Sequence, residues 1–140
     1  MATGTETLPS ASTDVRGGVI AYLQLDGATM AAEFYTRAFG AKTVAAHPVD
    51  DRGRTMHIHL HINDSSIMLS DAYPEHGHSL EKPQGFSLVL QVEDIDARWR
   101  RALDAGAEAV TPVTEMFWGD RFGLLRDPFG VLWAMNQPKR

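Results

Sequence analysis

Apolar and polar residues follow two different periods in the first half of the chain, and the change between them predicts its elements. Residues 18–25 (GVIAYLQL) form a mainly apolar run that stops at Asp26-Gly27, which is typical of a strand. Beyond it, apolar side chains recur every three or four residues until Gly40, as expected for an amphipathic helix with a glycine after its last turn. The apolar stripe of this helix consists of Met30, Ala31, Phe34, Tyr35, Ala38 and Phe39. Three further strands are predicted at residues 42–49, 55–62 and 66–70.

The second half repeats this order. A strand is predicted at residues 86–92, Asp94 is a suitable N-cap, and the helix that follows ends at Gly106. Gln24 and Gln91, at the ends of the two first strands, are 67 residues apart, and Gly40 and Gly106 are 66 apart. The second helix stripe is Ile95, Trp99, Ala102 and Leu103, and the later strands are 109–113, 121–126 and 131–136.

Each half therefore predicts a βαβββ module, and the fold class is α+β. We expect residues 1–16 to be a disordered N-terminal arm, and residues 17–140 to be a single domain. Its two modules span about 18–71 and 85–137, joined by a linker at 72–84. Two such modules, paired, would form a curved half-barrel around a cleft.

Composition narrows the classes of partner. With a net charge of -5 and a pI of about 5.6, the chain has no basic footprint for nucleic acid or for an anionic membrane. It contains no cysteine, and no apolar run is long enough to be a secretory signal or a membrane span. We therefore expect a cytoplasmic protein whose partner is a small molecule or another protein.

Several motifs resemble those of a known superfamily. Asp26 with Phe34-Tyr35 and residues 38–41 (AFGA) is similar to the "FY…LG" first helix of the vicinal oxygen chelate proteins, which include glyoxalases, bleomycin-resistance proteins and dioxygenases. Residues 127–130 (DPFG) resemble the turn before their last strand, and have the residue types of a type I turn. The resemblance covers residues 18–137 and implies the paired-module fold and a homodimer. The branch named after the protein PhnB is further resembled by Met56-His57, residues 68–71 and residues 117–121.

The resemblance also implies where a divalent metal would be bound. Carried over to this chain, the family's metal positions fall on Ile20, Met68, Ser87 and Ala134. None of these residues, nor their neighbours within two positions, is a His, Asp, Glu or Gln, which are the ligands that such metals need. We therefore expect no metal at the family's usual site and no other cofactor.

Three histidines alternate along one predicted strand. His57, His59 and His61 would project from the same face, about 6–7 Å apart in successive pairs. They could bind a relocated metal with Asp71 or Glu115 as a third ligand. They could instead form a polar wall of a ligand cavity, or only make local hydrogen bonds.

A second candidate group lies around a loop in the second half. Trp118 offers a rigid aromatic face on which a planar ligand could stack, with Phe117 beside it, and Arg121 could bind a carboxylate. The alternative is that Trp118 packs on the protein and Arg121 pairs with Asp120. Strand alternation would place Tyr22, Met68 and Ser87 on the wall of the cleft.

These features favour a metal-independent small-molecule-binding protein of the glyoxalase/bleomycin-resistance type. Its ligand would be planar or aromatic, such as a natural product or antibiotic that the protein sequesters to give drug resistance. If the protein is an enzyme, it is a divalent-metal-dependent lyase or dioxygenase with a site near His57 and His59. A third alternative is an accessory dimer without small-molecule chemistry.

Overall fold

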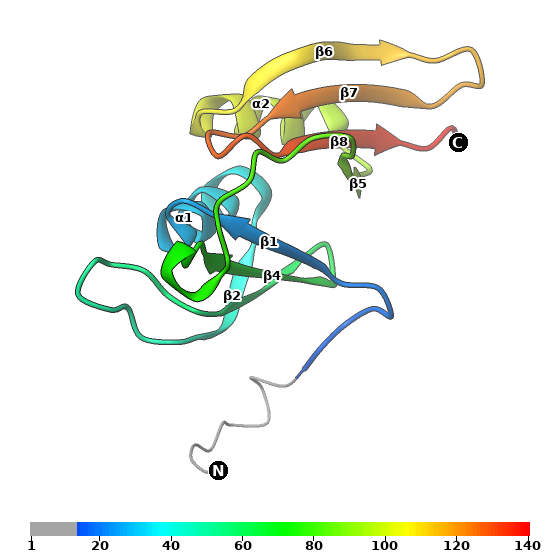
Figure 1. Cartoon of the computed structure of the whole chain (residues 1–140). Helices are drawn as coiled ribbons and strands as arrows, with labels where there is room; N and C mark the ends of the chain where they lie inside the picture. The colour runs from blue at the N-terminus through cyan, green and yellow to red at the C-terminus, as the bar shows by residue number, and fades with distance from the viewer. Residues whose placement is uncertain (1–13) are drawn as a thin grey trace. The chain divides into compact units, whose positions relative to one another are not determined.

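The computed structural model describes residues 14–140, which contain two four-stranded mixed sheets and two α-helices (Figure 1). In the first half, β1 (Ala21–Leu25) runs parallel to β4 (Ser65–Asp71), and β3 (Ile58–Ile62) and β2 (Lys42–Ala46) complete the sheet in the order β1-β4-β3-β2. Helix α1 (Ala28–Phe39) follows β1, and the short 3-10 helix η2 (Pro74–His76) follows β4.

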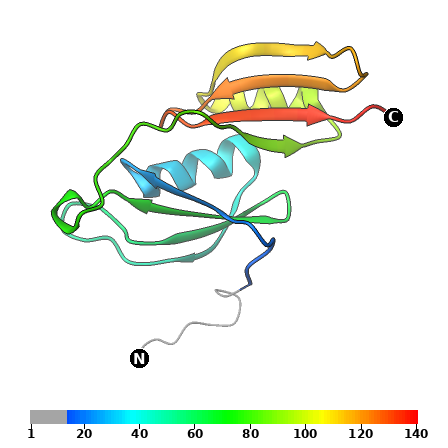
Figure 2. The same cartoon turned by 45° about the vertical axis from the view of Figure 1, so that its right-hand side comes forward.

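The second half has the same topology. β5 (Leu88–Gln91) runs parallel to β8 (Leu132–Gln137), and β7 (Arg121–Arg126) and β6 (Glu108–Glu115) complete the order β5-β8-β7-β6. Helix α2 (Ile95–Ala105) follows β5, and Figure 2 shows β6, β7 and β8 side by side across it. The two βαβββ modules and the α+β class predicted from the sequence are confirmed.

The chain divides into two compact units. The described part of the first unit comprises residues 14–32 and 41–80, and the second comprises 33–40 and 81–140. The later turns of α1 therefore belong to the same unit as the second sheet, whereas the predicted module boundary assigned the whole helix to the first half. Residues 1–13 of the predicted N-terminal arm lie outside the described residues.

Aromatic side chains of α1 form the core of the second unit with residues around β8. The rings of Tyr35 and Phe39 lie 5.2 and 4.6 Å from that of Trp133, measured between centroids, and Phe34 packs edge-on against Phe129. The buried Asp127 accepts hydrogen bonds from the Tyr35 hydroxyl and from Nε1 of Trp133. The later part of the helix stripe, Phe34, Tyr35 and Phe39, thus packs within the second unit around β8.

Alternation places opposite faces of the first sheet in different environments. Ile58, Leu60, Ile67 and Leu69 are buried on one face. Along β4 the intervening residues Ser66, Met68 and Ser70 point to the opposite face, which holds the candidate site.

Several element boundaries differ from the prediction. β1 and β3 each begin three residues later than expected, at Ala21 and Ile58. Met30 and Leu103, expected in the buried stripes, are exposed at the margins of their helices.

The N-terminus of α2 is capped from an unexpected direction. Asp94 occupies the N-cap position, but its side chain makes no capping hydrogen bond. The Ile95 amide donates instead to Oε1 of Gln137, at the end of β8. In the first half, the equivalent position, 66 residues earlier, is Asp71. Its Oδ1 accepts hydrogen bonds from the amides of Gly27, which precedes α1, and of Ala28, the first residue of α1. The repeat therefore includes the way in which both helices are capped.

Candidate functional site

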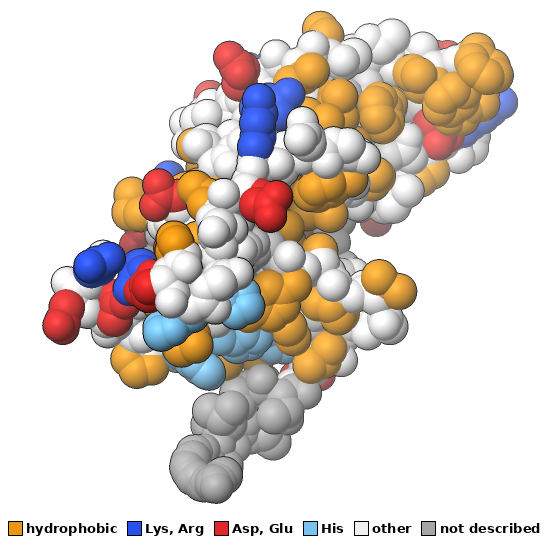
Figure 3. Space-filling view, viewed as in Figure 1, with side chains coloured by type: hydrophobic (Ala, Val, Ile, Leu, Met, Phe, Trp, Pro, Cys, Tyr) orange, Lys and Arg blue, Asp and Glu red, His pale blue; other side chains and the backbone are white. Residues whose placement is uncertain are grey.

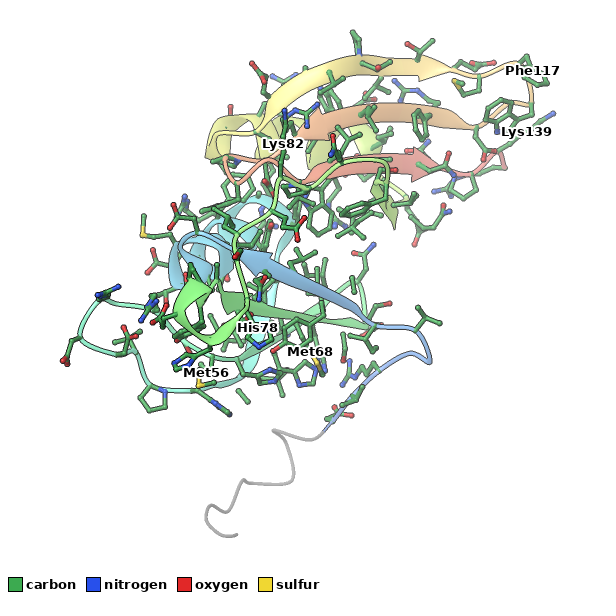
Figure 4. The ribbon with its side chains drawn as sticks, viewed as in Figure 1. Met56, Met68, His78, Lys82, Phe117 and Lys139 are labelled. Carbon is green, nitrogen blue, oxygen red and sulfur yellow. The ribbon has the colours of Figure 1, made fainter. Side chains whose placement is uncertain are left out.

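Five of the predicted site residues share one face of the first sheet. Tyr22 on β1 is the register partner of Met68 on β4, and Met68 is the partner of His59 on β3. His61 pairs with Ser66 in the same way, and His57 directly precedes β3 on the same alternation. We call the face formed by Tyr22, Met68, His57, His59 and His61 the histidine face. Figure 3 shows histidine side chains gathered over this unit, and Figure 4 labels Met68.

The histidine face has a partly exposed rim. Tyr22 is 53% exposed, and its hydroxyl lies 3.0 Å from Nδ1 of His57 and 3.4 Å from the carbonyl oxygen of Met56. Burial, and then the charges of His47 and His59, lower the pKa of His57 below its usual value. Burial raises the pKa of Tyr22. At neutral pH the rim therefore presents an uncharged phenol and an uncharged imidazole beside the Met68 thioether.

The floor of the face is buried and polar. His59 is only 1% exposed, and its Nε2 lies 2.7 Å from Oγ of Ser66, which accepts a hydrogen bond from the amide of Arg16. Nδ1 of His59 is buried without a hydrogen-bond partner among the described residues. His61 bonds through Nε2 to the carbonyl oxygen of Asp14. His61 thus bonds directly to the segment that precedes β1, and His59 is linked to it only through Ser66, whereas His57 borders Tyr22 at the rim.

Ser66 and Ser70, which were not among the predicted site residues, are buried on the same face. The sequence pattern could have predicted this position, because the polar residues 66 and 70 alternate with the apolar Ile67 and Leu69 along β4.

The third metal ligands expected for the histidines are not found. Asp71 alternates onto the opposite face, and both its carboxylate oxygens accept backbone hydrogen bonds, from Gly27, Ala28 and Thr55. Glu115 ends β6, in the other unit. Within residues 14–140, no group of three or more His, Asp or Glu side chains lies close enough together to hold a metal. Asp71 as the third ligand is therefore wrong, whereas Glu115 stays a prediction.

Phe117 and Trp118 lie at the turn between β6 and β7. Phe117 is 97% exposed and Trp118 47%, and their rings meet edge to face at 4.6 Å between centroids. Figure 4 shows Phe117 and Lys139 at the same end of this unit. The alkyl chain of Lys139 crosses Gly119, where an added Cβ would approach the lysine Cδ to 2.5 Å. The turn therefore presents two aromatic faces to solvent, next to a lysine stem.

Arg121 and Asp120 do not pair with each other. The Arg121 guanidinium makes two hydrogen bonds, of 2.8 and 3.0 Å, to the carboxylate of Asp96 on α2. Asp120 accepts hydrogen bonds from the amide of Lys139 and from Nδ2 of Asn136. The Arg121 guanidinium is thus already bound to a carboxylate, and a ligand carboxylate would have to displace Asp96.

The second sheet has residues that correspond to the row Tyr22, Met68 and His59 of the first sheet. Val89, Ala134 and Leu124 are register partners across β5, β8 and β7, and Ala134 stands where Met68 stands in the first sheet. Ser87, expected on the cleft wall, is partly buried just before β5. Ile20, the remaining family metal position, is partly buried just before β1. The row in the second sheet is wholly apolar.

Relatives in sequence and structure agree with this fold. An uncharacterized protein of Mycobacterium bovis is 38% identical over 125 residues, covering 85% of this chain and 82% of the relative. The PhnB protein from Bacillus cereus superposes with a TM-score of 0.65 at 21% identity, covering 87% of this chain and all of that one. The fosfomycin resistance protein FosX from Listeria monocytogenes gives a TM-score of 0.68 at 16% identity, covering 89% and 95%. At these identities the two structural likenesses indicate the fold alone.

The family assignment follows from the sequence itself. The sequence model of the Glyoxalase/Bleomycin resistance protein/Dioxygenase superfamily matches residues 20–135, which contain nearly all of both modules and every residue of the histidine face. No helix among residues 14–140 is long and apolar enough to cross a membrane. The chain belongs to the Glyoxalase/Bleomycin resistance protein/Dioxygenase superfamily.

Proposed function

We propose that the protein binds a small aromatic molecule without a metal, and sequesters it as a drug-resistance protein does. The observation that carries this proposal is the rim of the histidine face. There a half-exposed Tyr22, a thioether and a neutral imidazole lie together on adjacent strands. Such a surface offers apolar contact with a few directed polar groups, which is how small-molecule sites are usually built.

The positions of potential metal ligands support the metal-independent form of the proposal. The family's metal positions hold Ile20, Met68, Ser87 and Ala134, and the residues described in the structure contain no alternative cluster of three ligands. The competing function, a metal-dependent lyase or dioxygenase near His57 and His59, would need ligands from outside this set.

The family contains resistance proteins, of which FosX is one by its name. That relation supports the proposed biological role without indicating which compound this chain binds. We further propose that the protein is a cytoplasmic homodimer, and light scattering after size exclusion would measure its mass.

The test is a fluorescence and NMR titration of the full chain with a panel of neutral planar aromatic antibiotics. Tyr22→Ala should weaken binding of an active compound roughly tenfold, since loss of an aromatic contact is worth about 1 kcal/mol or more. Tyr73→Ala, a partly exposed tyrosine in the linker, is the matched control and should bind unchanged.

Trp118→Ala tests whether the β6–β7 turn also contacts the ligand. A tenfold loss would add the turn to the site, whereas unchanged affinity would restrict the site to the histidine face. Saturable binding that is equal in wild type and Tyr22→Ala would rule out the histidine face as the site.

A further inference from the structure

The second unit contains a surface cavity whose lining includes none of the predicted site residues. Its volume is about 490 Å³, and it lies where the segment leading into β5 passes the adjoining ends of β7 and β8. Figure 4 labels Lys82 on this segment. The cavity is lined by Lys82, Pro83, Gln84, Gly85, Phe86, Arg126, Gly130 and Leu132.

The charge of this lining is opposite to that of the chain. Lys82 and Arg126 are both cationic, and no lining residue is acidic, although the chain as a whole carries a net charge of -5. The buried Asp127 is next to Arg126 in sequence, but its Oδ2 accepts from Tyr35 and Trp133 and its Oδ1 from two backbone amides. These hydrogen bonds direct the Asp127 carboxylate to partners outside the cavity lining, which itself has two cationic side chains and no acidic one.

Arg126 is held in place and retains donors. It is part of β7, with Leu132 as its register partner on β8, and Nη1 donates weakly to the carbonyl oxygen of Gly130 at 3.4 Å. A guanidinium has five N–H groups, so this bond leaves others for an anion. Glu108 is the register partner of Arg126 on β6, but it is not among the lining residues.

The rest of the lining is apolar and offers room for a ring. Phe86 is 46% exposed, and Leu132 and Pro83 are partly exposed. Gly85 and Gly130 have positive φ angles of 83° and 91°, which side-chain-bearing residues rarely adopt. A cavity with two cations beside an aromatic side chain suits a molecule that has an anionic group and a flat apolar body.

We propose that this cavity binds a small aromatic carboxylate. Lys82 and Arg126 contact the carboxylate, while Phe86 and Leu132 contact the ring. The site consists of residues of the second unit alone and shares none with the histidine face, so it does not depend on the function proposed above.

The experiment is an amide NMR titration of the full chain with 2-naphthoate. Saturable shifts are expected at Gly85, Phe86 and Gly130, and the neutral analogue 2-naphthalenemethanol should bind at least roughly tenfold more weakly, because it cannot form charge-assisted hydrogen bonds. Lys82→Gln and Arg126→Gln should each weaken the binding of 2-naphthoate by about five- to tenfold. Lys82 is exposed, so its variant keeps the test valid if Arg126→Gln fails to fold.

Two controls separate this site from the others. Arg100→Gln, on the exposed surface of α2, should leave 2-naphthoate binding unchanged, as should Tyr22→Ala on the histidine face. The proposal is overturned if no saturable shifts occur up to about 10 mM 2-naphthoate. It is also overturned if the neutral analogue binds equally well, or if Lys82→Gln and Arg126→Gln both bind 2-naphthoate as the wild type does. Loss of binding in Tyr22→Ala alone would move the ligand to the histidine face instead.

Discussion

At the scale of single residues, the buried Asp127 carboxylate joins three parts of the second unit. It accepts hydrogen bonds from Tyr35 on α1, from Trp133 on β8 and from two amides of its own turn. Burial and the neighbouring Asp127 charge raise the pKa of Tyr35 well above its usual value, so the phenol remains a hydrogen-bond donor throughout the accessible pH range. The turn motif DPFG therefore has a second role as an anchor for α1.

Tyr35→Phe tests the strength of this anchor. The change keeps the ring but removes one hydrogen bond to a buried carboxylate, so the free energy of unfolding should fall by about 2 kcal/mol. Urea denaturation measures the change. Tyr73→Phe, in the linker, should change the free energy of unfolding by less than about 0.5 kcal/mol. Equal effects of the two variants would mean that the Tyr35 hydroxyl contributes little.

His57 should make stability depend on pH. Because its pKa is lowered in the folded protein, the unfolded chain binds more protons between the folded pKa and the unfolded value of about 6.5. Stability from this group is fully present above about pH 6.5 and is lost as the pH falls through the folded pKa. Urea midpoints between pH 8 and 5 should therefore fall less in His57→Gln than in wild type. Met56→Gln, an exposed neighbour without a titrating group, should retain the wild-type slope.

At the scale of elements, each helix is capped by the last residue of its module's final strand. Asp71 bonds to the start of α1 and Gln137 to the start of α2. Sequence reasoning chose Asp94 for α2, because N-cap preference is a local rule. The register that brings Gln137 to the Ile95 amide depends on pairing between strands about 40 residues apart in the chain.

The two possible caps of α2 can be compared directly. Gln137→Ala should lower the free energy of unfolding by about 1 kcal/mol, the usual value of a capping hydrogen bond. Asp94→Asn, which keeps the shape but removes a charge near the helix N-terminus, should cost less than about 0.5 kcal/mol. Chemical denaturation of both variants distinguishes them, and a larger loss in Asp94→Asn would reverse the assignment.

At the scale of the whole molecule, the duplication gives two sheets whose corresponding faces differ chemically. The row Tyr22, Met68 and His59 in the first sheet corresponds to Val89, Ala134 and Leu124 in the second. The half-barrel and cleft expected from pairing the modules stay predictions. Of these two corresponding rows, only the row of the first sheet carries polar side chains.

This arrangement predicts how the protein responds to metals. Dialysis against EDTA should leave the thermal midpoint unchanged, and Zn²⁺ or Mn²⁺ should not raise it, because residues 14–140 bring no three suitable ligands together. Elemental analysis of the purified protein provides an independent measurement. A stoichiometric metal that is absent from His57→Gln would favour the metalloenzyme instead.

The sequence alone was sufficient for those features that depend on neighbours along the chain. Periodicity predicted the βαβββ order, the stops at Gly40 and Gly106, and the common face of the three histidines along one strand, because a strand alternates its side chains regardless of context. The register that brings Tyr22 and Met68 to the same face came from strand pairing. The sequence also showed that the family's metal positions lack ligand residues.

The tertiary structure decided which partner each polar group has. His59 is bonded to Ser66, Arg121 to Asp96, and Asp127 to Tyr35, 92 residues away. Such pairs depend on strand register and on which sheet a helix packs against, and these are set by burial of the whole chain and not by local preference. Residue types therefore predicted the candidate site, but only the fold separated its exposed rim from its buried floor.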